Sequence, residues 1–136
     1  MTQCKECKDN PKLTRSLIGK RNRAKGRRFE QRCDEFLRKQ GWLLTKWSNN
    51  VDLTTKKIVP AKGNPFHVST GFPDRFGINQ DKKSEWYGNI SFFEYKVNGY
   101  LDKIEVEKVK VLRKDWKFYV LCKGQKKGEI LMKEIK

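Results

Sequence analysis

The sequence predicts an α/β fold in which a mixed central β-sheet is flanked by helices. Two observations support this class. Apolar residues recur with helical spacing near residues 24–40, and at 101–115 they partly alternate but cluster on one side of a helix, which favours a helix there. Short apolar segments with the length or period of strands lie between and after these two stretches. The resulting order, α-β-β-β-α-β-β, is typical of a sheet covered by helices. At 136 residues, the chain can bury one modest core.

The first predicted helix, at 24–40, has an apolar stripe of Phe29, Cys33, Phe36 and Leu37, and Gly41 follows as a stop. Glu30 lies about 100° around the helix from Phe29, at the edge of this stripe.

Five strands and two turns are expected after this helix. Residues 42–47 and 73–78 are expected strands. The long stretch 48–72 between them is expected to be a functional flap or to hold a local hairpin at 51–59. A polar turn at 81–84 precedes the clearest strand, 90–97. After the second helix come a buried strand at 117–123, a turn at 125–128 and a last strand at 129–135.

The charge of the chain favours a polyanionic partner. Lysine and arginine number 32 against 16 acidic residues, a formal net charge of +16. Such a field attracts nucleic acid or an anionic membrane surface, and a merely soluble basic surface is the alternative. Residues 1–23 lack periodicity and are expected to form a flexible basic arm before a folded domain at 24–136. The expected DNA-contacting residues here are Lys20, Arg21, Arg23, Lys25, Arg27 and Arg28.

No apolar run approaches the ~20 residues that would span a bilayer, and the N-terminus lacks the apolar segment of a signal peptide. We therefore expect no membrane partner and a cytoplasmic location, associated with the nucleoid or nuclear according to the host.

Asp74, Glu94 and Lys96 form the main candidate site. Alternation along a strand puts Glu94 and Lys96 on one face, about 6.5–7 Å apart. Two carboxylates, with the Tyr95 backbone carbonyl as a third ligand, suit a hard cation such as Mg²⁺, for which Mn²⁺ often substitutes. Lys96 would orient a water nucleophile and stabilise charge at phosphorus. The alternative is a surface ion pair and a turn dipeptide, but charges within the apolar segment 91–97 are costly unless used or paired.

Gly71-Phe72-Pro73-Asp74 followed by Phe93-Glu94-Tyr95-Lys96 resembles the motifs of the PD-(D/E)xK nuclease superfamily, whose restriction-endonuclease-like core is α-β-β-β-α-β. The stretches 25–30 and 37–42 are similar to the opening helix of archaeal-type Holliday junction resolvases, and the Gly-Phe-Pro-Asp spelling resembles the VRR-NUC branch. The stretch 47–74 is longer than resolvases usually have.

That resemblance implies roles for individual residues. Asp74 and Glu94 would be metal ligands, Lys96 the catalytic lysine and Glu30 an auxiliary acid. Ser48 would contact a phosphate, and Lys108 on the second helix would face the site or be a surface lysine.

Other candidates are weaker. Cys4 and Cys7 have the spacing of half a zinc site, whereas Cys33 and Cys122 are expected in the core. His67 is expected to be a loop residue without catalytic duty, and Trp86 and Tyr87 either stack on bases or pack.

The sequence thus predicts a Mg²⁺-dependent endonuclease acting on DNA, with branched DNA as leading substrate and a homodimer as the expected assembly. Two alternatives stay open: a homing, restriction or repair nuclease of the same fold, and a nucleic-acid-binding protein without catalysis.

Overall fold

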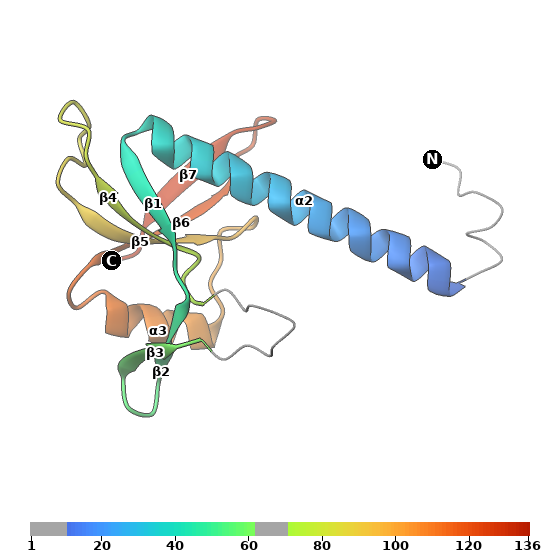
Figure 1. The fold of residues 1–136 in the computed structure, drawn as a ribbon, viewed down its shortest axis with the longest axis horizontal. Coiled ribbons are helices and arrows are strands. Elements are labelled where there is room, and N and C mark those ends of the chain that lie inside the picture. Colours follow the sequence, from blue (N-terminus) through green and yellow to red (C-terminus); the bar gives the residue numbers. More distant parts are fainter. Residues whose placement is uncertain (1–10, 62–70) are drawn as a thin grey trace. The chain divides into compact units, whose positions relative to one another are not determined.

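The computed structural model describes residues 11–61 and 71–136, with side chains described from residue 17 onward. Figure 1 shows its elements. They are α2 (Pro11–Lys39), β1 (Trp42–Lys46), β2 (Asn49–Asp52), β3 (Lys57–Pro60), β4 (Arg75–Asn79), β5 (Ile90–Tyr95), α3 (Lys103–Leu112), β6 (Lys117–Lys123) and β7 (Ile130–Glu134). The chain divides after Gln31 into two compact units.

The larger unit is built on a five-stranded sheet with strand order β1-β4-β5-β6-β7. Neighbouring strands are antiparallel except β5 and β6, which are parallel. A parallel pair needs a crossover connection, and α3 lies within this one, as Figure 1 shows. The sheet is therefore mixed and flanked by helix, which confirms the predicted α/β class.

The expected hairpin at 51–59 is confirmed. β2 and β3 pair in register from Asn49↔Pro60 to Asp52↔Lys57 and form a small separate sheet. Val51 of this hairpin is buried and joins a core cluster with Phe72, Phe92 and α3 residues Val109 and Leu112. His67 lies outside the described residues.

The two faces of β5 serve different contacts. Phe92 packs into the α3-side cluster with Phe118, and both are fully buried. Phe93 points the other way and meets Trp42 edge to face, with ring centroids 4.8 Å apart, and Tyr119 in a stack. Burying one such ring contributes roughly 1.5–3 kcal/mol to the free energy of unfolding. The expectation that Cys33 and Cys122 belong to the core is also confirmed.

The predicted helix start at residue 24 is wrong, because residues 11–23 already form the first half of α2. The reason is that lysine and arginine have high helix propensity, while the apolar periodicity from which helices are inferred is missing there. Pro11 suits the first helical position because its missing N–H would have no partner in the helix. Cys4 and Cys7 lie outside the described residues.

Candidate active site

Asp74 and Glu94 are brought side by side by the pairing of β4 with β5. Arg75 is the register partner of Phe93, so the preceding residue, Asp74, lies opposite Glu94. The backbone N–H of Tyr95 donates to Asp74 Oδ2 at 2.9 Å. The two carboxylates, twenty residues apart in sequence, thus meet at one end of two adjacent strands.

A close backbone contact at Gly71 holds the segment that carries Asp74. Gly71 N–H donates to Trp47 O at 3.0 Å, Phe72 N–H to Asn49 O at 2.9 Å, and Trp47 N–H to Asp74 O at 3.3 Å. A Cβ atom at position 71 would overlap the Asn49 carbonyl. Only glycine lets the two backbones approach this closely, and the segment is thereby tied to the end of β1.

Glu94 is a buried carboxyl group, 4% exposed. Burial is the main cause that raises its pKa, and the hydrogen bond and negative charge of Asp74 raise it further, to about 10; Lys96 opposes the shift only in part. Two carboxyl groups in contact away from water bind either a proton or a cation.

Lys96 lies on the same face as Glu94, as the alternation of the strand predicts. Its Nζ is 3.9 Å from Glu94 Oε2 but only 2.8 Å from Glu105 Oε2. Partial burial by itself lowers the pKa of Lys96, yet the hydrogen bond to Glu105 and the nearby carboxylates outweigh it, and the net shift is upward. Lys96 is therefore an ammonium group, held mainly by Glu105.

Glu105 was not predicted from the sequence, and the structure assigns it to the site. Asp102 Oδ1 accepts from Glu105 N–H at 2.8 Å, and Glu105 Oε1 accepts from Asp102 N–H at 3.1 Å, so the two residues form a capping box at the start of α3. The second oxygen, Oε2, is left to bind Lys96. The Asp-x-x-Glu spacing was a visible signal for the cap, although not for the lysine contact.

A second network lies behind the site. Arg75, 5% exposed, donates from Nε to Asp34 Oδ1 at 3.0 Å and from a terminal nitrogen to the Asp74 carbonyl at 3.0 Å. The Tyr95 hydroxyl donates to Asp34 Oδ1 at 2.6 Å. Burial, followed by Asp34, raises the Tyr95 pKa above its usual range. Sequence reasoning missed Asp34 and Arg75, which link the C-terminal half of α2 to the strand ends.

Lys108, Ser48 and Glu30 were also predicted as site residues. Lys108 Nζ sits 5.7 Å from the centre of the Phe72 ring, a cation–π contact two residues before Asp74. Ser48 is exposed and follows Trp47, whose N–H binds Asp74 O. Glu30 is exposed and belongs to the unit that ends at Gln31, so its role as auxiliary acid stays a prediction.

The donor set fits a divalent cation that keeps part of its water. Asp74 and Glu94 supply carboxylate oxygens in contact, and the Tyr95 backbone follows directly. Within the described ranges 11–61 and 71–136, no three histidine, cysteine or acidic side chains are grouped to hold a metal by themselves. Magnesium commonly binds proteins through one or two carboxylates together with waters and substrate phosphates, and Asp74 and Glu94 are the two carboxylates that could hold it here.

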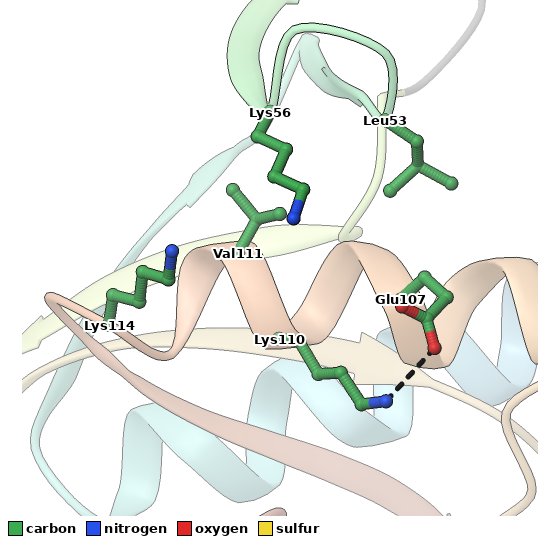
Figure 2. A pocket seen from close by; sticks show the side chains of 6 residues that line it. All are labelled: Leu53, Lys56, Glu107, Lys110, Val111 and Lys114. Atoms are coloured by element: carbon green, nitrogen blue, oxygen red, sulfur yellow. Dashed lines mark hydrogen bonds and ion pairs between the residues drawn. The ribbon is translucent and has the colours of Figure 1, made fainter.

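A cavity of about 200 Å³ lies between the hairpin turn and α3, and Figure 2 shows its lining: Leu53, Lys56, Glu107, Lys110, Val111 and Lys114. Glu107 and Lys110 pair within it at 3.0 Å. None of the predicted catalytic residues lines this cavity.

Comparison of the chain with protein-family models, curated proteins and solved structures gave no match. Across the described residues, no helix has the length and apolar character needed to cross a membrane.

Proposed function

We propose that this protein is a Mg²⁺-dependent endonuclease of the PD-(D/E)xK type that hydrolyses phosphodiester bonds in DNA. The observation that carries the proposal is the contact between Asp74 and buried Glu94, with the Lys96 ammonium 3.9 Å from Glu94 Oε2. The order of the main-sheet strands and helices is compatible with the α-β-β-β-α-β core of that superfamily.

Each group has a defined task in this proposal. Asp74 and Glu94 would hold Mg²⁺, with the Tyr95 carbonyl as a further ligand. The bound ion would lower the pKa of a coordinated water and neutralise charge on the phosphate. Lys96 donates hydrogen bonds to the water or to a phosphate oxygen as charge develops there. Its raised pKa favours a donor over a proton acceptor.

Glu105 has a positioning role. Phosphoryl transfer depends mainly on placement and electrostatics, and a lysine side chain has four rotatable bonds that must be fixed. Glu105 is itself fixed, because its other oxygen belongs to the capping box of α3. The first turn of α3 therefore sets where the Lys96 ammonium stands.

The net charge of +16 favours DNA as the substrate. Branched DNA is the leading form, cut by a homodimer so that two sites meet two strands. A homing, restriction or repair nuclease of the same type would use the same residues.

The test is cleavage of junction, flap, nicked, single-stranded and linear duplex DNA by the purified protein, with Mg²⁺, with Mn²⁺ and in EDTA. We expect cutting only with metal, strongest on branched DNA, and none by Glu94→Ala. Cutting by Glu94→Ala at the wild-type rate would refute the proposed site.

A second candidate function is nucleic-acid binding without catalysis, favoured by the exposed cationic part of α2. Tight binding of DNA with no cleavage of any of these substrates under either metal would establish it instead.

A further inference from the structure

The N-terminal part of α2 is rich in lysine and arginine. From Pro11 to Arg28 the sequence has eight lysines and arginines and no acidic residue. All six that fall in 17–28, where side chains are described, are exposed. Like charges three and four positions apart destabilise an isolated helix, and no carboxylate of this stretch offsets them. Such a helix is stabilised by a polyanion laid against it.

The cations are arranged in two rows. At about 100° per residue, Lys20, Arg23 and Arg27 fall within roughly 60° of one another and form row one. Arg21, Lys25 and Arg28 fall within a second arc of roughly 60° and form row two. The centres of the rows are about 140° apart around the helix.

Uncharged residues separate the rows. Leu17, Ala24 and Gln31 recur every seven residues and lie within about 40° of one another, inside the shorter arc between row one and row two. Ala24, at the middle of this stripe, is the smallest of the three. The helix thus presents a narrow uncharged stripe with a row of cations on each side.

These dimensions match the major groove of B-form DNA. That groove is about 12 Å wide and admits one α-helix, whose diameter with side chains is about 10–12 Å. Each wall of the groove carries a phosphate backbone, and cations on both flanks of an inserted helix reach both walls. The major groove of an RNA duplex is too narrow for this fit. Leu17 and Ile18 lie about 100° apart and form no apolar face for a membrane.

We propose that residues 17–28 of α2 lie in the major groove of duplex DNA, with row one and row two on opposite phosphate backbones and Ala24 facing the groove floor. This proposal rests on the proposed function for the identity of the partner, DNA. It does not require that the protein cleaves DNA.

The experiment uses the full chain in EDTA, so that binding is measured without cutting. Affinity for a linear duplex, a single strand and vesicles rich in anionic lipid is measured across a salt series, together with hydrogen exchange of residues 17–28. We expect preference for the duplex and slower exchange of these amides when it is bound.

Charge variants test the rows. One triple variant removes row one and another removes row two: Lys20→Gln/Arg23→Gln/Arg27→Gln and Arg21→Gln/Lys25→Gln/Arg28→Gln. Each triple variant should weaken duplex binding at least about tenfold. Each should also reduce the slope of log K against log salt by about 2.7, which is about 0.9 for each phosphate contact. The control Lys123→Gln/Lys126→Gln/Lys127→Gln removes the same charge from exposed positions near the β6–β7 turn and should change the slope by less than about 1.

Two tryptophan variants distinguish a helix that is inserted in the groove from one that is only attracted to DNA by its charge. Ala24→Trp keeps every charge but fills the stripe, and should weaken duplex binding at least about tenfold, a loss of about 1.4 kcal/mol. Asn22→Trp, about 160° away on the helix, should bind like the wild type.

Three outcomes would each overturn the groove proposal. The two tryptophan variants could weaken duplex binding equally, or only one of the two row variants could lose affinity. The amides of residues 17–28 could also exchange more slowly with vesicles but not with duplex DNA. Duplex binding with the expected pattern, in a protein that cuts no DNA when metal is added, would leave this inference standing and refute the proposed nuclease activity.

Discussion

Two glutamates of α3, Glu105 and Glu107, each pair with a lysine. The two pairs have the same chemistry but differ in burial and in the elements that they join. Glu105 meets Lys96 at 2.8 Å with side chains 15% and 31% exposed, whereas Glu107 meets Lys110 at 3.0 Å with side chains 56% and 63% exposed. The first pair joins two elements and stands beside Glu94; the second spans one turn of a single helix beside the cavity of Figure 2.

The difference shows that distance alone does not mark a functional ion pair. An exposed pair within one helix is screened by water and contributes about 0.2–0.5 kcal/mol. A half-buried pair whose glutamate is also fixed by a helix cap has one geometry, and that geometry can serve a reaction. Six substitutions test this contrast.

The largest effect is expected at the carboxylates and the lysine of the site. Asp74→Ala, Glu94→Ala and Lys96→Ala should each lower the rate of DNA cleavage at least about a thousandfold, about 4 kcal/mol in the barrier. DNA affinity in EDTA should stay within about threefold, because the expected phosphate contacts lie elsewhere. Single-turnover cleavage with matched binding assays measures both, and a residual rate above a tenth of wild type for any of them would remove that residue from the mechanism.

Next is the stability cost of burying Glu94. Glu94→Gln keeps the shape of the side chain but removes the ionisable group, so it should raise the free energy of unfolding in EDTA at pH 7 by about 2–3 kcal/mol while abolishing cleavage.

The direction in which stability changes with pH follows from the raised pKa of Glu94. Folding favours the protonated form of Glu94, so wild-type stability relative to Glu94→Gln should be unchanged below the usual pKa of 4.5 and fall as pH rises from there toward about 10. Urea unfolding of both proteins in EDTA from pH 4 to pH 9 measures the gap. A gap that is constant across this range would mean that Glu94 is ionised in the metal-free protein.

Glu105→Gln should lower the cleavage rate about ten- to a hundredfold, about 1.4–2.7 kcal/mol, without raising KM. Glutamine can still accept the capping hydrogen bond, so the melting temperature should move little. The nitrogen NMR signal of the Lys96 ammonium gives a readout apart from activity: slow proton exchange in wild type, fast exchange in the variant. Unchanged exchange and rate would show that Lys96 is positioned by other groups.

The smallest effect is expected at the matched position two residues along. Glu107→Gln removes the same charge from the exposed side of α3 and should change stability by less than about 0.5 kcal/mol and the rate by less than twofold. Chemical denaturation and the same cleavage assay provide the comparison. If Glu107→Gln lowers the cleavage rate as much as Glu105→Gln does, the loss of one negative charge on α3, and not the contact with Lys96, would explain both effects.

Local periodicity explains what could be read from the sequence. The period of two in β5 predicts that Glu94 and Lys96 share a face, and the helical stripe predicts the buried positions Cys33 and Leu37. The hairpin was expected from the length of the segment 48–72, and α3 from an apolar cluster at 101–115 that was ambiguous between helix and strand.

The unpredicted contacts depend on long-range geometry. Asp34 is 41 residues from Arg75 and 61 from Tyr95, and no spacing rule joins them. Glu105 reaches Lys96 only because the crossover from β5 to β6 brings the first turn of α3 beside the strand end. The start of α2 was missed because a helix that needs no apolar face leaves no periodic signal.

The first turn of α3 links local unfolding of the helix to the geometry of the site. Helix ends open before whole domains do, because local unfolding costs less free energy than global unfolding. Once the first turn of α3 opens, Glu105 loses its hydrogen bond to Asp102 N–H and with it the fixed direction of its second oxygen. Heating should therefore disorder Lys96 while the sheet is intact, so the proposed activity would be lost at a temperature below that of global unfolding.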